Sequence, residues 1–335
     1  MRERVFYFDN AKFILIFLVV FGHFLRSFTD ENDMIYTIYK VIYTFHMPAF
    51  ILVSGYFAKG YYKKGYIKKI AMKLIIPYLI FQLIYSVFYY FLLNKSTFEV
   101  DPLTPHWSLW FLISVFFWNI MLWQFAKFKA VYAISAALIL GLCIGYFDWA
   151  NNFLSISRTF VFFPLFLIGY FLKKDHFRQL FKKQVRVLSM LIFVLVFVWF
   201  WLYPDINYEW LLGSKPYAQM GAESYLAVLT RLGFYILSII MCFSFLSLVP
   251  KRKLFFTRLG KNTLYVYLLH GFFIRFFRES DIQNYFSNTE SMLIIAIASL
   301  LLTLLLSSKL VTSFAQPIIE LSTSRLRNLK LRIEK

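Results

Sequence analysis

A lysine and a histidine near the start of the chain have the spacing of two residues on one helix face. Lys12 and His23 are separated by eleven positions, so an α-helix would bring them to within about 20° of each other, roughly 16 Å apart along its axis. Asp9 precedes Lys12 by three positions and is expected to pair with it. Such an arrangement would suit a donor molecule that is bound at Lys12 and reacts at His23. The alternative is an interfacial charge pair and a packed histidine, and the spacing favours neither.

The next apolar stretch carries a second histidine. His46 lies two positions before Pro48, at a depth similar to that of His23, and could face it from an adjacent helix. In the other interpretation, its side chain bonds a backbone carbonyl that Pro48 leaves without a donor. Ser54 and Gly55 follow on the same stretch and predict a point where two helices approach closely.

Several cations and one more histidine are candidates for supporting roles. Lys69 and Lys73 lie four positions apart before an apolar run and could hold the phosphates of a cytosolic cofactor. Basic residues at such a place usually only mark the cytoplasmic side of a membrane. His270 lies in the middle of a late apolar run, where a histidine is more often packed than catalytic. Arg231 and Lys309 also fall inside predicted spans, where burying an ionisable group costs free energy and so points to function.

Membrane helices must position these residues. Of the 335 residues, 60% are hydrophobic and 16% are charged, a composition too apolar for a soluble domain. The apolar runs are long enough to cross about 30 Å of hydrocarbon, and they do not alternate with polar residues as membrane strands would. We predict an all-α polytopic membrane protein, a bundle of about ten transmembrane helices, near 11–28, 39–58, 74–94, 107–125, 130–147, 158–172, 187–203, 224–249, 263–277 and 292–314.

The charges orient these helices. The net charge of +19 could suit nucleic acid, but 27 of the 36 Lys and Arg residues fall in alternate segments between the spans, as the positive-inside rule requires. Both termini are therefore predicted to be cytoplasmic, with a basic tail at 315–335. The opposite side holds 12 of the 17 Asp and Glu residues. With no repeat or linker in view, residues 1–335 are predicted to form a single membrane domain.

The residue types inside the predicted spans narrow the function. No Asp or Glu lies in the middle of a span, which disfavours ion-coupled transporters because these usually bury carboxylates; a lipid flippase stays open. No metal-ligand cluster and no nucleotide-binding loop is found, so no metal is expected. Most tryptophans fall toward the predicted outer side, where an interfacial belt explains them and sugar stacking is a second use.

The ordered set of motifs resembles the acyltransferase 3 family of bacterial membrane acyltransferases. The family's first two signatures correspond to Tyr7–His23 and Phe45–Tyr56, and the segments that begin at Lys73, Trp110, Phe163 and Leu259 follow in the expected order. The resemblance covers nearly the whole chain. Where the family commonly has an arginine, this chain has Lys12, as in the subgroup similar to fucose 4-O-acetylases; the charge is kept, but a bidentate grip is lost. The family's cytoplasmic arginine pair corresponds to Lys69 and Lys73.

The resemblance implies an activity. Family members move acyl groups, usually acetyl from acetyl-CoA, to sugars of surface polysaccharides. We therefore expect an O-acetyltransferase of the bacterial plasma membrane that acts on a cell-surface polysaccharide or its lipid-linked precursor. His23 would be a general base or a transient acyl carrier; acetyl-CoA would be bound by Lys12 with Asp9, Lys69 and Lys73; support would come from His46, Ser54, His270 and Arg231. The alternatives are a flippase or exporter of polysaccharide intermediates and a structural membrane component.

Overall fold

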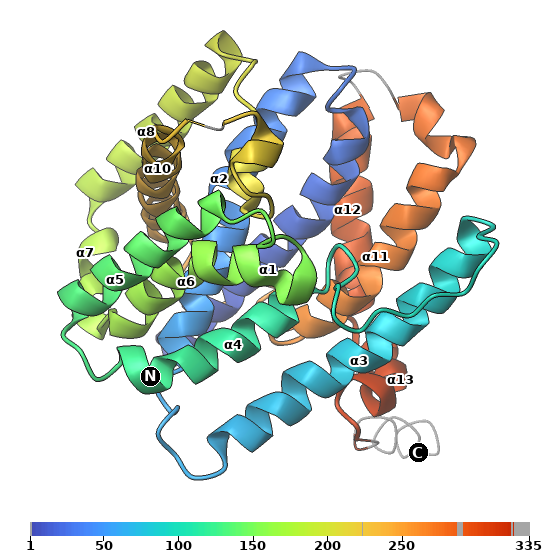
Figure 1. Ribbon diagram of the computed structural model, residues 1–335, viewed down its shortest axis with the longest axis horizontal. Coiled ribbons are helices and arrows are strands. Elements are labelled where there is room, and N and C mark those ends of the chain that lie inside the picture. Colours follow the sequence, from blue (N-terminus) through green and yellow to red (C-terminus); the bar gives the residue numbers. More distant parts are fainter. Residues whose placement is uncertain (1, 223, 287–290, 323, 325–335) are drawn as a thin grey trace. The chain divides into compact units, whose positions relative to one another are not determined.

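The computed structural model describes residues 2–222, 224–286, 291–322 and 324. These residues form helices and loops without a β-strand, so the predicted all-α fold is confirmed (Figure 1). The α-helices are α1 (Arg2–Leu25), α2 (Asp33–Phe57), α3 (Tyr66–Leu92), α4 (Trp110–Phe125), α5 (Ala130–Cys143), α6 (Ile156–Phe171), α7 (Lys174–Leu180), α8 (Lys183–Leu202), α9 (Glu209–Leu212), α10 (Ala227–Leu248), α11 (Thr263–Glu279), α12 (Ser291–Ser307) and α13 (Lys309–Ile319).

Each of the ten predicted spans contains an observed helix, and several helices are apolar enough to cross a membrane. Within the described residues, six helical segments are also long enough: α2, α3, α8, α10, α1 with its extension to Phe28, and α6 together with the preceding turn Phe153–Ser155. The bent pair α12 and α13 makes a seventh if it counts as one span. Helices α4 and α5 are apolar but shorter, and α11 carries Arg275 and Arg278. The chain is thus a polytopic membrane protein, whereas the count of ten spans and the side on which the termini lie stay predictions.

The last predicted span is not one helix. Helices α12 and α13 are bent by 61° relative to each other, and the side chain of Ser308 accepts a hydrogen bond from the backbone of Val311 to begin α13. Lys309 is the first residue of the new helix and is exposed, so the expectation that it lies buried in a span was wrong. The capping serine was the local signal that a helix begins there.

Contacts divide the chain into two compact units, which interleave along the sequence. The first comprises Met1–Ile35, Ile75–Pro102 and Pro250–Lys335, and the second comprises Tyr36–Leu74 and Leu103–Val249. In the first unit α1 packs against α11 and α12. In the second, α5 packs on α6 and α8 on α10, around a core that includes Trp118, Phe163 and Phe166. The sequence prediction of a single domain remains a prediction.

Two glycines bring α2 and α6 of the second unit into backbone contact. A Cβ atom on Gly55 would overlap the carbonyl of Phe166, and one on Gly169 would overlap the carbonyl of Leu52. The close approach that Ser54 and Gly55 predicted is therefore confirmed. Because lipid tails are as apolar as the helices, contact between backbones through small residues is a main source of helix association in a membrane.

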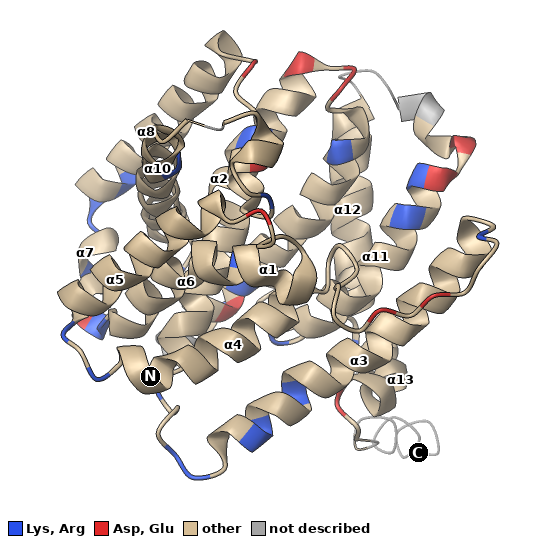
Figure 2. Ribbon diagram, in the orientation of Figure 1, with Lys and Arg blue, Asp and Glu red and all other residues tan. Residues whose placement is uncertain are grey.

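Charged residues are few along the helices and lie mostly near their ends, as Figure 2 shows. The first turns of α3 carry Lys68, Lys69 and Lys73, whereas the segment that follows this helix carries Glu99 and Asp101. The lysines at the start of α3 belong to the Lys and Arg pattern from which the orientation of the chain was predicted.

Candidate active site

The charge pair predicted at the start of the chain is formed within α1. Lys12 Nζ lies 2.9 Å from Asp9 Oδ1, one helical turn away. The carboxylate is almost completely buried, while the lysine side chain stays 24% exposed. The lysine charge is therefore paired with an acid that is largely shielded from water.

His23 lies on the same helix and is half-buried. Its imidazole packs against the imidazole of His270 from α11, with ring centroids 5.4 Å apart and ring planes 20° from parallel. In the sequence, His270 stands alone, and His46 is the histidine that could face His23. In the first unit of the structure, His23 instead contacts His270, which lies 247 positions later in the sequence.

The inner ring of this pair is fixed by its own helix. His270 is fully buried, and its Nδ1 lies 3.0 Å from the carbonyl oxygen of Val266 one turn earlier. A carbonyl only accepts, so Nδ1 carries the hydrogen in this contact. The next residue, Gly271, leaves no room for a Cβ atom because the Tyr85 hydroxyl of α3 occupies that place and donates to the carbonyl of Leu268 at 2.8 Å. His270 thus presents a rigid aromatic face to His23.

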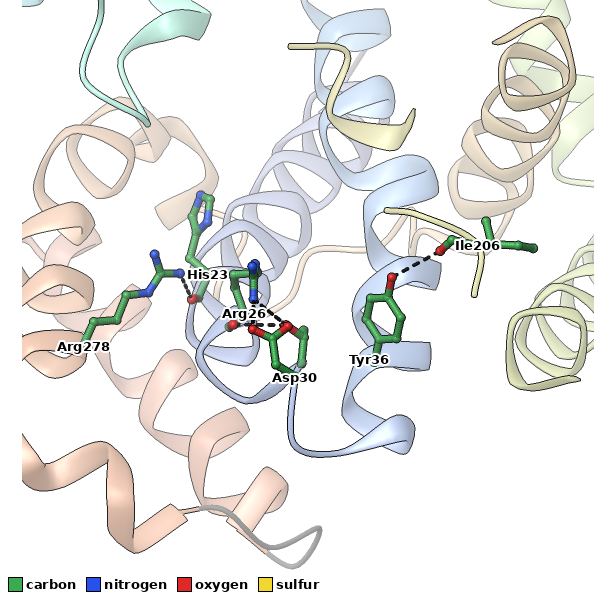
Figure 3. A network of polar contacts seen from close by, with 7 residues as sticks. His23, Arg26, Asp30, Tyr36, Ile206 and Arg278 are labelled. Carbon is green, nitrogen blue, oxygen red and sulfur yellow. Dashed lines mark hydrogen bonds and ion pairs between the residues drawn. The ribbon is translucent and has the colours of Figure 1, made fainter. Parts of the chain in front are cut away.

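An arginine that the sequence analysis missed also holds the His23 backbone. Arg278 Nη2 donates to the carbonyl oxygen of His23 at 2.6 Å (Figure 3). This carbonyl belongs to the last turn of α1, where the α-helix passes into the 3₁₀ turn Arg26–Phe28. In Figure 3 the imidazole points away from Arg26 and Asp30, whose side chains form a separate ion pair of 3.2 Å. No sequence signal joins Arg278 to His23, since the two lie on helices far apart in the chain.

The other predicted donor-binding residues lie in the second unit. Lys69 and Lys73 lie one turn apart on α3 and are both exposed, as their spacing predicted. Nothing in this geometry distinguishes phosphate binding from a basic membrane border, so their role stays a prediction.

His46 and Ser54 are satisfied inside α2. His46 is buried, and its Nδ1 lies 2.9 Å from the carbonyl oxygen of Ile42, while its ring packs edge-on against Tyr43. A carbonyl partner was expected, but the one left without a donor by Pro48 belongs to Thr44, four positions earlier; that detail was wrong. The Ser54 hydroxyl donates to the carbonyl of Phe50 at 2.9 Å. Both contacts describe local packing, and their supporting roles remain untested.

Arg231 is buried at the start of α10, as predicted, and it holds a loop. Its Nη1 donates to the carbonyl oxygen of Trp210 at 3.0 Å, and its guanidinium lies 5.2 Å from the Trp210 ring and 5.5 Å from that of Tyr217. Burial raises the pKa of Tyr217, and the nearby arginine partly opposes this rise. The contacts are those of a cation between two aromatic faces, each worth roughly 0.5–2 kcal/mol.

A second buried cation holds the same loop from α2. Lys40 is fully buried and donates to the carbonyl of Pro204 at 2.8 Å, with the ring of Tyr36 4.0 Å away. The Tyr36 hydroxyl donates to the carbonyl of Ile206 at 3.2 Å (Figure 3). Lys40 and Arg231 therefore bind the backbone at the two ends of the segment 204–210. The sequence did not indicate that these two residues hold the same loop.

That segment forms one wall of a cavity of about 830 Å³, whose other walls are α8 and α10. The lining is largely aliphatic and aromatic. Its polar members are Asp205, Asn207 and Thr230, and two indoles, Trp199 and Trp210, face it. This volume is within the range of small-molecule sites, and the mixture suits a ligand with a hydrocarbon part and a hydroxyl-bearing part.

Comparisons with known proteins relate most of this chain to a family of acyltransferase domains. A family model described as an acyltransferase domain matches residues 5–308. The nodulation protein NolL of Sinorhizobium fredii is 46% identical over 55 residues, a stretch that covers 16% of this chain and 15% of the relative. The match therefore spans only a small part of that protein. No solved structure matches.

Proposed function

The chain belongs to the acyltransferase family, and from this premise we propose that it transfers an acetyl group from cytosolic acetyl-CoA to a hydroxyl of a cell-surface polysaccharide or its lipid-linked precursor. The observation that carries the proposal is the state of His23. His23 is half-buried and lies on the same helix as the Asp9–Lys12 pair; its imidazole stacks on that of His270, and its backbone carbonyl accepts a hydrogen bond from Arg278. A fixed yet accessible imidazole is what acyl transfer near neutral pH requires.

Two routes use this imidazole. As a general base, His23 accepts the proton of the sugar hydroxyl while the hydroxyl oxygen attacks the thioester carbonyl. The C–S bond breaks, a C–O ester bond forms, and the proton passes to the leaving sulfur. As an acyl carrier, an imidazole nitrogen attacks first and releases the thiol, and the sugar hydroxyl takes the acetyl group in a second step. Both routes need an unprotonated ring nitrogen of His23 that the substrate can reach at the edge of the ring.

The donor-binding part of the proposal rests on charge. Lys12, oriented by Asp9, would contact the donor close to the start of α1, and Lys69 and Lys73 would add positive charge from α3. This arrangement requires that the protein lie in the bacterial plasma membrane, with acetyl-CoA on the cytosolic side.

The acceptor part rests on the cavity beside the segment 204–210. We assign to it the hydrocarbon portion of a lipid-linked acceptor, with hydroxyl groups near Asp205 and Asn207. A flippase, the alternative function, would call for a continuous polar path through the membrane. The largely apolar lining favours an amphiphilic ligand over such a path.

Replacement of the central histidine tests the proposal. His23→Ala removes the only part of His23 that can bind a proton or an acetyl group, so acetyl transfer from labelled acetyl-CoA to glycan should fall at least about 100-fold. His176→Ala, at an exposed position on α7, is the matched control and should leave transfer unchanged. Retained transfer in a well-inserted His23→Ala protein contradicts the role of His23. Glycan movement without label transfer in the unaltered protein supports the flippase.

A further inference from the structure

The loop between α10 and α11 is the most basic part of the first unit that the structure describes. Within Pro250–Asn262 there are five cations and no acid, and all five are exposed: Lys251, Arg252, Lys253, Arg258 and Lys261. In the sequence analysis these residues served only to orient the membrane helices. Their position in the fold indicates a more specific role.

A buried amide of α1 fixes this loop. Asn10, which is fully buried between Asp9 and Lys12 in the chain, donates through Nδ2 to the carbonyl oxygens of Pro250 and Arg252, each at 2.9 Å. Its Oδ1 accepts from the hydroxyl of Thr257 at 2.6 Å. That hydroxyl in turn accepts from the backbone of Leu254 at 2.7 Å. The side chain of Asn10 is thus the centre of a closed network that sets the path of the loop.

Packing brings the loop directly onto the first turns of α1. A Cβ atom on Gly260 would overlap the carbonyl of Asp9, so only glycine permits this approach. The rings of Phe13 and Phe256 stack with centroids 4.6 Å apart. The positive-inside rule requires only that cations be present on one side; it does not explain why their backbone is fastened beside the charge pair of α1.

The charge balance at this place favours an anionic ligand. Asp9 offsets the charge of Lys12 at 2.9 Å, and the loop adds five positive charges beside this pair. Arg252, Lys253, Arg258 and Lys261 make none of the ion pairs found among the described residues. Because the backbone of the loop is already held by Asn10, little backbone conformational entropy is lost when an anion binds.

We propose that the loop Pro250–Asn262 binds the phosphate groups of the nucleotide part of a thioester donor. The inference rests on the proposed function, since it is the acetyl-CoA of that reaction that supplies a nucleotide with several phosphates. The thioester end of the donor would extend from the loop along α1 toward His23. The arginine at 252 can hold a phosphate with two parallel hydrogen bonds, and the lysines act as point charges.

The test compares two donors that carry the same thioester. The double variant Arg252→Gln with Lys253→Gln is measured with acetyl-CoA and with acetyl-pantetheine, which lacks the nucleotide. The KM for acetyl-CoA should rise about tenfold or more with kcat little changed, because a phosphate contact made in the ground state is lost, while the KM for acetyl-pantetheine stays the same. Lys182→Gln with Lys183→Gln, a matched loss of two cations from the second unit, should change neither KM.

Three outcomes overturn the proposal: no change in the KM for acetyl-CoA, an equal rise for both donors, or an effect that appears only in bilayers containing anionic lipid, which assigns the loop to lipid headgroups. If the unaltered protein transfers acetyl from neither donor, the proposed function fails on its own. The loop is then judged by binding of adenosine 3′,5′-bisphosphate in neutral-lipid nanodiscs. Weaker binding to the Arg252/Lys253 variant than to the control variant supports the site, and equal binding refutes it.

Discussion

At the scale of single residues, the candidate site is an imidazole whose surroundings come from remote parts of the chain. The pairing of Asp9 with Lys12 was predictable because residues three apart on a helix are neighbours. The stack of His23 on His270 and the cap that Arg278 provides were not, since contacts between helices depend on how the helices pack. His270 can support the site in two ways, as an aromatic face against His23 or as a second proton-binding group.

Two substitutions at His270 separate these roles. His270→Phe keeps an aromatic face against His23, whereas His270→Asn keeps a donor for the Val266 carbonyl but loses the face. We expect the Phe variant to retain most activity and the Asn variant to lose about threefold to tenfold in kcat, since such ring contacts are worth roughly 0.5–1.5 kcal/mol. The rates are measured with acetyl-CoA at saturating acceptor. Loss of activity in both variants to the level of His23→Ala would assign proton transfer to His270.

At the scale of elements, helices and loops of this protein are held by buried polar groups whose partners are backbone carbonyls. Lys40 and Arg231 bind the carbonyls of Pro204 and Trp210, and Asn10 binds those of Pro250 and Arg252. A buried cation or amide without such partners would be strongly destabilising. These residues therefore shape the two loops on which the donor and acceptor proposals depend, and their functional effect is through the loops.

The cavity offers a direct test of acceptor binding. Gly233 lines it, and a Cβ atom at this position would meet no other atom within 4 Å, so Gly233→Phe can fill the space without displacing the backbone. We expect the KM for a lipid-linked sugar to rise about tenfold, while the KM for the same sugar without lipid is unchanged. Ile236→Phe, at a position of α10 that is 54% exposed and outside the cavity lining, is the control. If the KM values of the Gly233 variant are unchanged, the lipid part of the acceptor does not bind in this cavity.

At the scale of the whole molecule, the membrane topology follows from charge and length together. Ten predicted spans, an even number, place both termini on the basic, cytoplasmic side. Six helices of the described residues satisfy the length and apolarity of a span, and a bent pair makes a seventh. Whether the number of spans is even depends on helix α11. This helix is the least typical of the predicted spans, because it is 17 residues long and carries Arg275 and Arg278.

Reporter fusions test this topology. Alkaline phosphatase, which is active only outside the cytoplasm, should be active when fused after Ser280 and inactive when fused after residue 335; a fluorescent protein at the C-terminus should fluoresce. The expected pattern reflects the free energy needed to move the basic segments across the bilayer. An inactive fusion after Ser280 would show that α11 does not cross the membrane, and the predicted number of spans would fall.

The sequence by itself determined the helical class, the membrane setting and the pairing within α1, because apolar run length and helical periodicity are local properties. It also predicted that another helix approaches α2 closely at Gly55, whereas the structure identifies that helix as α6. Only the tertiary structure decided that His270 and Arg278 lie against His23 and that Asn10 ties a basic loop to the helix of the charge pair. These features arise from contacts across hundreds of positions, where no periodicity links the partners.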